Sequence, residues 1–222
     1  MIKKILVTGT SSGLGFKIAD SLSKKYKVVG LSRSIGKASK IKKKKFEYIN
    51  LDISNFEDFK KLDKIKNIDC MINNSSIFSL KKFENTSHDV IIKTINTNLI
   101  GTILVTKKIL ENNKRLKKII NILSVSGLNG IKNQAIYSAT KHGLKGFFDS
   151  LSQEKINKIS ICNIFPGGMK TELWNNLTKV DKKKISKFLD TNEVSNLIEF
   201  LLKQKNSTIY KSITVFPNND WH

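Results

Sequence analysis

The chain has 222 residues, of which 39% are hydrophobic, 12 are glycine and 2 are proline. This length and composition are typical of one well-packed globular domain, and they exclude a chain of repeats or low-complexity linkers. The formal net charge at pH 7 is +22, and nearly all of the positive charge is lysine because only Arg33 and Arg115 are arginine.

Lysine runs are scattered along the chain, at 42–45, 117–118 and 182–184. They are not interleaved with the aromatic residues that a single-strand nucleic-acid surface needs. Lysine, asparagine and isoleucine are abundant together, which indicates codon bias in an AT-rich genome. We therefore expect no specific nucleic-acid partner, although a basic nucleic-acid-binding protein is kept as the weaker alternative. The positive field is expected to attract an anionic cofactor or substrate.

No apolar run approaches the roughly 20 residues that span a bilayer, and the apolar stretch at 2–7 is too short for a signal peptide. We therefore expect a cytoplasmic protein without a membrane partner. Cys70 and Cys162 both lie in apolar, strand-like runs, so a disulfide is not expected. The three histidines show no ligand spacing, and no metal site is expected.

The first element is a short apolar run at 2–8, typical of a parallel strand buried on both faces. The sequence Thr-Gly-Thr-Ser-Ser-Gly-Leu-Gly follows at 8–15, and an amphipathic segment then extends over about 14–25. Glycines between a strand and a helix allow a tight turn and the close approach of a diphosphate. A glycine-rich loop by itself can be only a turn, but these flanking elements favour a dinucleotide site. Its predicted contacts are Gly9, Ser11, Ser12, Gly13, Leu14 and Gly15.

The second predicted strand, at 27–32, ends in the sequence Leu-Ser-Arg-Ser. A carboxylate at this position suits the ribose 2′-hydroxyl of NAD, whereas an arginine suits the 2′-phosphate of NADP. Arg33 supplies a planar fork for a phosphate, and Ser32 and Ser34 add hydroxyl donors. The alternative is a solvent-facing arginine, but no Asp or Glu lies between Asp20 and Glu47. The sequence therefore predicts NADP(H).

The next predicted elements alternate between strands and helices. They are a strand at 46–51, an amphipathic segment at 56–65, a strand at 68–73, a long helix at 87–114 and a strand at about 119–124. The last of these strands ends in Ser124, which a turn follows at 126–127. Ser124 is therefore expected at the carboxyl edge of the sheet, where open α/β folds bind their ligands.

The predicted helix at 134–156 carries Tyr137 and Lys141, which are four residues apart and therefore lie on one face. An ammonium close to a phenol favours the phenolate, and we expect it to lower the pKa of Tyr137 from about 10 toward neutrality. Such a phenol can exchange a proton with a carbon–oxygen centre. Taken alone, this pair is also common on solvated helix faces.

Ser124, Tyr137 thirteen residues later and Lys141 four residues further resemble the signature of the short-chain dehydrogenase/reductase family. The Gly-x-x-x-Gly-x-Gly spacing of the first loop is similar to that of the same family. The resemblance runs from residue 2 to about 171, and more loosely to the C-terminus. It implies that Ser124 donates a hydrogen bond to the substrate oxygen, Tyr137 supplies a proton, and Lys141 tunes the phenol and binds the nicotinamide ribose.

The resemblance also implies contacts with the adenosine of the cofactor. Asp52 would meet the adenine amino group, Ile53 would line the ring, and Asn74 would lie beside the ribose. The alternative role of this region is a helix N-cap near residues 52–54, because an amphipathic segment follows it, and both roles could hold at once. Ser75 and Ser76 replace the Ala-Gly that the family usually has after its two asparagines, and we expect a local adjustment of the backbone there.

Two further family features concern the chemistry. Asn98 matches a helical asparagine that holds a water passing protons toward the lysine, although a polar contact with a neighbouring helix is the alternative. A buried asparagine needs partners, and a local distortion of the main chain with a bound water would supply them. The segment 166–171 resembles the family's Pro-Gly-x-x-x-Thr, which implies cofactor contacts from Pro166 and Gly167 and a nicotinamide carboxamide contact from Thr171.

The remaining predicted elements are a strand at 160–165, a substrate-covering segment at about 172–189, a helix at 191–205, a strand at 208–216 and a polar tail at 217–222. In the covering segment Trp174 favours an apolar or ring-bearing substrate, whereas Lys170 and Lys179 favour an anionic one.

The predicted fold is a three-layer α/β Rossmann fold with a parallel seven-stranded sheet of order 3-2-1-4-5-6-7, in a single domain over 1–222. We expect an NADP(H)-dependent oxidoreductase acting on a small carbonyl or alcohol substrate. An NADP-binding sensor with little turnover is the alternative. The family resemblance implies a homodimer or homotetramer through the two long helices.

Overall fold

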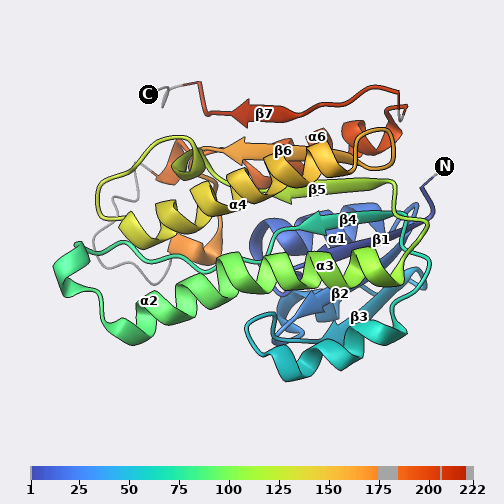
Figure 1. Cartoon of the computed structure of the whole chain (residues 1–222), viewed down its shortest axis with the longest axis horizontal. Coiled ribbons are helices and arrows are strands. Elements are labelled where there is room, and N and C mark those ends of the chain that lie inside the picture. The colour runs from blue at the N-terminus through green and yellow to red at the C-terminus, as the bar shows by residue number, and fades with distance from the viewer. Residues whose placement is uncertain (1, 175–184, 206, 219–222) are drawn as a thin grey trace.

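The structure is a computed structural model, and it describes residues 2–174, 185–205 and 207–218. Seven parallel strands form one sheet in the order β3-β2-β1-β4-β5-β6-β7 (Figure 1). The strands are β1 (Lys4–Thr8), β2 (Lys27–Ser32), β3 (Phe46–Asn50), β4 (Cys70–Asn73), β5 (Lys118–Ile122), β6 (Ser160–Pro166) and β7 (Ser212–Val215). The predicted fold class and strand order are therefore confirmed.

Helices cover both faces of the sheet (Figure 1). One face carries α1 (Gly13–Leu22) and α6 (Thr191–Lys203), which pack against each other. The other face carries α2 (His88–Ile95), the π-helical turn η4 (Asn96–Gly101), α3 (Thr102–Asn112) and α4 (Ala135–Glu154). Short 3-10 segments connect them: η1 (Gly36–Lys40), η2 (Phe56–Lys64), η3 (Phe83–Asn85), η5 (Val125–Gly127) and η6 (Glu172–Trp174).

The central strands β4, β5 and β6 are buried along their whole length because both of their faces are covered. In β1, Ile5 and Val7 belong to the core beneath α1 and α6, whereas Leu6 between them belongs to the core beneath α3 and α4. This alternation follows from the two-residue period of a strand. Cys70 and Cys162 are buried as free thiols, as the sequence predicted. Within the described ranges, no helix is long and apolar enough to cross a bilayer.

Several element boundaries differ from the sequence predictions. The single helix predicted over 87–114 is interrupted by η4, where the buried side chain of Asn98 binds the chain after β4. The segment at 56–65 is a 3-10 helix, and Asn55 caps it rather than Asp52.

The C-terminal elements differ as well. The helix predicted from 191 is capped by Asp190 in a capping box with Glu193. The last strand covers only Ser212–Val215, whereas the sequence predicted 208–216. Parts of the predicted covering segment and tail lie outside the described residues. They are residues 175–184, which include Lys179, and residues 219–222.

Candidate active site

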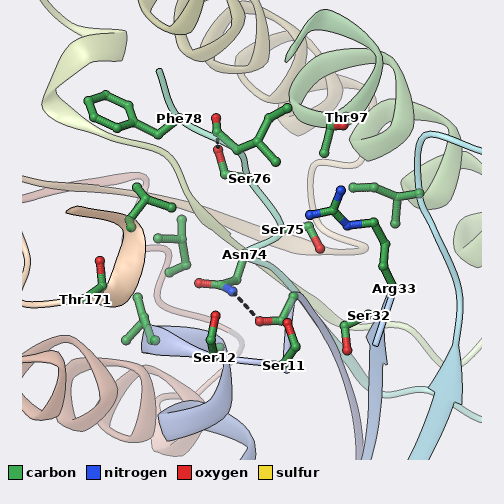
Figure 2. A pocket seen from close by; sticks show the side chains of 18 of the residues that line it. Ser11, Ser12, Ser32, Arg33, Asn74, Ser75, Ser76, Phe78, Thr97 and Thr171 are labelled. Atoms are coloured by element: carbon green, nitrogen blue, oxygen red, sulfur yellow. Dashed lines mark hydrogen bonds between the residues drawn. The ribbon is translucent and has the colours of Figure 1, made fainter. Parts of the chain in front are cut away.

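A cavity of about 490 Å³ lies at the carboxyl edge of the sheet. Its lining comes from the ends of β1 to β5, from α1, η4 and α4, and from the segment after β6. Figure 2 shows the part that contains the glycine loop, Arg33, Asn74, Thr97 and Thr171. Strand β1 lies between β2 and β4, so the chain turns to opposite sides of the sheet at this edge. Open α/β sheets bind ligands at such a switch point because the two connecting loops diverge and leave a crevice.

The glycine loop between β1 and α1 adopts a backbone that side chains would obstruct. Gly9 and Gly13 have φ values of +76° and +53°, in the left-handed region. A Cβ at Gly15 would lie 2.0 Å from the Gly9 carbonyl oxygen. The loop residues Gly9, Ser11, Ser12, Gly13, Leu14 and Gly15 all line the cavity. The loop therefore presents backbone and small side chains at the N-terminus of α1, as a phosphate site requires.

Asn74 joins the glycine loop to the end of β4. Its Nδ2 donates to the carbonyl oxygens of Thr8 at 3.1 Å and Gly9 at 3.3 Å. In return, Thr8 Oγ1 accepts from the backbone N–H groups of Asn74 and Ser75, both at 3.0 Å. Asn74 also lines the cavity. Asn74 therefore positions the loop and can also contact a ligand. The next residue, Ser75, packs against the backbone of Gly9.

Arg33 lies at the end of β2 with an exposed side chain that lines the cavity (Figure 2). The two serines predicted to assist it behave differently. Ser32 lines the cavity, but its hydroxyl donates to the Ser34 carbonyl oxygen at 2.8 Å. Ser34 is exposed and is not among the lining residues. Of the three predicted 2′-phosphate ligands, Arg33 is therefore the one whose side-chain donors line the cavity and make no hydrogen bond within the described ranges.

Asp52 and Ile53 line the cavity together with Arg33, as the family resemblance implied. The Asp52 carboxylate accepts hydrogen bonds from both the N–H and the hydroxyl of Ser54, at 2.9 and 2.7 Å. Thr97, which sequence analysis missed, also lines the cavity, and its buried hydroxyl has no hydrogen-bond partner among the described residues (Figure 2). Its position next to Asn98 was the available signal.

Tyr137 lies near the N-terminus of α4, and its side chain contributes to the cavity wall. Burial raises the pKa of Tyr137 to about 12, and hydrogen bonds with the hydroxyls of Ser124 and Ser76 act in the opposite direction. Ser124 is held in place because its Oγ accepts from the Ser126 N–H at 3.1 Å. The spacing of Ser124 and Tyr137 in the sequence therefore does bring their hydroxyl groups together.

Lys141 is only 2% exposed and lies one helical turn beyond Tyr137. Its Nζ donates to the Ile122 carbonyl oxygen at 3.2 Å and lies 5.4 Å from the centroid of the Tyr137 ring. Burial lowers the pKa of Lys141 to about 7. The prediction that Lys141 draws the pKa of Tyr137 toward neutrality is wrong in this structure, because desolvation dominates both groups and disfavours both charged forms.

Asn98 lies in η4 and is fully buried. Its Oδ1 accepts from the Ile77 N–H and its Nδ2 donates to the Ile77 carbonyl oxygen, both at 2.8 Å. The side chain thus binds the chain after β4 as a neighbouring strand would. Asn98 Nδ2 also lies 3.4 Å from Thr140 Oγ1 on α4. The predicted distortion of the main chain is present at this residue, and its role in a proton relay stays a prediction.

The segment after β6 brings Thr171 to the cavity beside Gly13. Pro166 and Gly167, which were predicted to bind the cofactor, are not among the lining residues. Pro166 is buried at the end of β6, and the Gly167 N–H donates to Val215 on β7 at 2.8 Å. In this structure these two residues direct the chain toward Thr171 and do not face the cavity.

Aromatic rings cover the end of the cavity that contains Tyr137. The Phe78 ring packs edge-on against Tyr137 with 4.9 Å between centroids, and it lies 5.3 Å from the Trp174 ring. Trp174 also packs against Phe188 at 5.0 Å and donates from Nε1 to the Met169 carbonyl oxygen. Sequence analysis missed Phe78, although it closely follows the two asparagines at the end of β4.

Glu172 was also missed as a site residue. Its Oε2 accepts from the Gly13 N–H at 3.0 Å, and its Oε1 pairs with Lys37 Nζ. The hydrogen bond from Lys37 holds the pKa of Glu172 below its usual range, so the carboxylate is charged at neutral pH. Residues 37 and 172 are too far apart in the sequence for any local pattern to indicate this pair.

Besides this arrangement of glycine loop, serine, tyrosine and lysine, most of the chain is similar to a known protein family. Residues 3–182 match the family described as short chain dehydrogenase. The chain therefore belongs to the short-chain dehydrogenase/reductase family, and it is an oxidoreductase by family.

Individual proteins of known name are similar as well. The chain is 33% identical over 228 residues to the 3-oxoacyl-(acyl-carrier-protein) reductase FabG of Buchnera aphidicola, covering 93% of this chain and 92% of that protein. An alcohol dehydrogenase from Thermococcus sibiricus, complexed with 5-hydroxy-NADP, has a TM-score of 0.88 at 21% identity and covers 100% and 99% of the two chains. A 4-hydroxyisoleucine dehydrogenase complexed with NADH has a TM-score of 0.82 at 26% identity, covering 97% of each chain.

Proposed function

We propose that this protein is an NADP(H)-dependent oxidoreductase that transfers a hydride between the nicotinamide and a carbonyl or alcohol carbon. The observation that carries the proposal is that Tyr137 and the buried Lys141 amine line one end of the cavity and that the Ser124 hydroxyl is hydrogen-bonded to the Tyr137 hydroxyl, although Ser124 itself is not among the lining residues. The other end of the same cavity contains the glycine loop and Arg33. A sensor without turnover would have no need of this set of proton-transfer groups.

The residues present fit a nicotinamide dinucleotide. The glycine loop packs tightly at the N-terminus of α1, because a Cβ at Gly9 or Gly15 would collide with neighbouring backbone, and backbone amides at a helix N-terminus suit a diphosphate. Asp52, Ile53 and the Thr97 hydroxyl, which has no partner in the part of the chain that the structure describes, would hold the adenosine, and Thr171 would hold the nicotinamide end. When bound, such a cofactor supplies or accepts the hydride.

The residues of the chain then control the proton and the substrate oxygen. The Ser124 hydroxyl donates a hydrogen bond to that oxygen, and Tyr137 Oη gives it a proton during reduction. With a pKa raised to about 12, Tyr137 holds its proton at neutral pH until a strongly basic oxygen develops. Lys141, with a pKa of about 7, exchanges protons readily and can restore the proton of the phenol.

The substrate is proposed to be a small carbonyl compound with an apolar group next to the reacting carbon. Phe78, Leu173 and Met169 line the cavity near Tyr137, and Trp174 packs against Phe78. Burying an apolar substituent against these side chains is favourable. The similarity to a 3-oxoacyl-carrier-protein reductase supports reduction of a carbonyl as the direction.

We also propose a cytoplasmic homodimer or homotetramer that assembles through the helices of the α4 face. Two free cysteines are consistent with a reducing compartment. On α2, Ile92 is 58% exposed, and on α4 a Cβ at Gly146 would meet nothing within 4 Å, so these helices offer surface for a second copy.

The cofactor preference is tested by comparing NADP⁺ and NAD⁺ binding to the wild-type protein and to Arg33→Leu. We expect NADP⁺ to bind the wild-type protein more tightly. The variant should lose about 10- to 100-fold in NADP⁺ affinity, because a charge-assisted hydrogen bond to phosphate is removed, with little change for NAD⁺. Isothermal titration calorimetry measures both dissociation constants.

The matched control is Arg115→Leu, which removes the only other arginine, at the opposite edge of the sheet. It should leave the ratio of the two dissociation constants unchanged. Tighter binding of NAD⁺ than of NADP⁺ by the wild-type protein would contradict the cofactor assignment. Oxidation of NADPH with a panel of apolar ketones and 3-oxoacyl thioesters then tests turnover, and its complete absence would favour the sensor.

A further inference from the structure

Glu172 joins three segments that are remote in the sequence. It is the first residue of η6, and its carboxylate reaches the first residue of α1, where Oε2 accepts from the Gly13 N–H at 3.0 Å. The other oxygen pairs with Lys37 Nζ on η1. One carboxylate therefore bridges the covering segment, the glycine loop and the loop after β2, and all three border the same cavity edge.

The donors that hold Glu172 are those that an anionic ligand would use. The Gly13 N–H is among the first amides of α1, which have no partner within the helix. The N-cap residue Ser12 makes no side-chain capping bond, so the carboxylate of Glu172 takes this place. A helix N-terminus next to a lysine ammonium favours a negative charge, and a diphosphate carries more charge than a carboxylate.

Lys37 is held against the glycine loop by the backbone rather than by its own side chain. Its N–H donates to the Ser11 carbonyl oxygen at 2.7 Å. The preceding Gly36 has φ +45°, and a Cβ there would lie 2.5 Å from the same oxygen, so η1 packs directly on the loop. Lys37 therefore stays beside the N-terminus of α1 whether or not its ammonium is paired with Glu172.

The pair can be opened by a ligand because Glu172 lines the cavity and both side chains are partly exposed, although Lys37 is not among the lining residues. The Lys37 and Glu172 side chains are 46% and 37% exposed. Ion pairs of this exposure contribute little to stability, since water and salt compete with them. Breaking the contact therefore costs the fold little, while a ligand that takes over both donors gains charge-assisted hydrogen bonds.

We propose that Glu172 is a built-in stand-in for the cofactor diphosphate, and that Lys37 is a further cofactor-binding residue. On binding, the diphosphate replaces the carboxylate at the Gly13 N–H and at Lys37 Nζ. This inference rests on the proposed dinucleotide-binding function. Its consequences are that Glu172 competes with the cofactor and lowers its apparent affinity, and that η6 separates from α1 when the cofactor is bound.

The first experiment measures NADP⁺ and NAD⁺ binding to Glu172→Gln by isothermal titration calorimetry. The glutamine keeps the size of the side chain but removes the competing charge, and we expect both cofactors to bind about 3- to 10-fold more tightly. The control is Glu154→Gln, at the exposed end of α4, which changes the net charge of the protein equally and should leave both dissociation constants unchanged.

The second experiment introduces Lys37→Met into the Glu172→Gln protein, so that loss of the lysine is measured without its effect on the carboxylate. We expect about 5- to 20-fold weaker binding of both NADP⁺ and NAD⁺, because the diphosphate is common to them. A loss confined to NADP⁺ would place Lys37 at the 2′-phosphate and overturn its assignment to the diphosphate.

The outcomes separate this inference from the function on which it rests. If the wild-type protein binds neither dinucleotide, the proposed function fails. If the wild-type protein binds one but Glu172→Gln binds it equally or more weakly, the function stands and the stand-in role of Glu172 is overturned. Tighter binding by both Glu172→Gln and Glu154→Gln would indicate only an effect of net charge, which also overturns it.

Discussion

Buried polar side chains at the two edges of the sheet differ in how completely they are hydrogen-bonded. At the amino edge, Asp69 is 3% exposed and its carboxylate accepts from the N–H groups of Lys3 and Lys4, at 2.8 and 2.9 Å, and from Arg115 Nε at 3.1 Å. Nearby, Asn113 Oδ1 accepts from the Ile68 N–H at 3.0 Å. The side chains of Asp69 and Asn113 are thus satisfied by the chain itself, whereas the buried Lys118 amine at the start of β5 makes one described hydrogen bond, to the Leu201 carbonyl oxygen.

At the carboxyl edge the polar groups are buried but incompletely used. Lys141 makes one described hydrogen bond, to a carbonyl oxygen, and its pKa is lowered by burial to about 7. The Thr97 hydroxyl has no partner within the described part of the chain. Burying polar groups without full compensation costs stability. The difference teaches that the amino edge maintains the fold, whereas the carboxyl edge keeps bonding capacity for a ligand.

The largest expected effect that separates the edges is that of Tyr137→Phe. This change removes the proposed proton donor and should lower kcat by about 10²- to 10⁴-fold. The free energy of unfolding should change little, because the phenol ring and its contact with Phe78 are kept. Steady-state turnover with NADPH and urea denaturation provide the two measurements. Near-full turnover with intact cofactor binding would show that Tyr137 is not the proton donor.

Asp69→Ala should have the opposite profile. It leaves two backbone N–H groups and Arg115 without their acceptor, and should lower the free energy of unfolding by about 2–4 kcal/mol. Turnover of the folded protein should be unchanged. The control is Asp63→Ala, which removes a surface partner of Lys108 and should change stability little. A loss of kcat with unchanged stability in Asp69→Ala would break the contrast between the edges.

The pH dependence of the Asp69 contribution has a defined sign. Burial acts to raise the pKa of Asp69, but the N–H donors of Lys4 and Lys3 and the Arg115 guanidinium outweigh it and lower the pKa. A carboxyl with a lowered folded-state pKa stabilises the fold above its unfolded pKa, about 4, and this contribution is lost as the pH falls further. The difference in stability between the wild-type protein and Asp69→Ala should therefore shrink below pH 4.

Lys141→Met tests the carboxyl edge of the sheet, and its expected effect on stability is smaller than that of Asp69→Ala. We expect the variant to lose turnover but to gain about 1–3 kcal/mol of stability at pH 7, because a desolvated amine is replaced by an apolar side chain. Lys145→Met, on the same helix, is the control and removes a half-buried lysine paired with Asp149. A variant that is less stable than the wild-type protein would mean that the Lys141 amine is well compensated.

The sign of the Lys141 effect also follows from its pKa. The folded-state pKa of about 7 is below the unfolded value of about 10.4. Below pH 7 both states carry the proton and the cost of burial is complete. Between pH 7 and about 10.4 the unfolded state binds more protons, so the wild-type protein gains stability as the pH rises. Lys141→Met should lack this rise, which urea titrations at pH 7 and 9 would measure.

The features predicted well from the sequence depend on local rules. Strand and helix periods place Ser124 at a strand end, and the four-residue spacing places Tyr137 and Lys141 on one helix face. A glycine between a strand and a helix predicts a tight turn with positive φ from the local sequence alone, and Gly9 and Gly13 do adopt positive φ. The family and the order of the strands were therefore predictable before any coordinates were available.

Tertiary structure decided what depends on contacts between remote segments. The Glu172–Lys37 pair joins residues 135 positions apart, and Phe78 reaches Tyr137 only because the chain after β4 passes the start of α4. The raised pKa of Tyr137 reverses the sequence prediction because burial is a property of the whole packed chain. Backbone geometry and side-chain spacing were thus set by the sequence directly, whereas desolvation and long-range pairing required the fold, since both depend on which distant atoms exclude water.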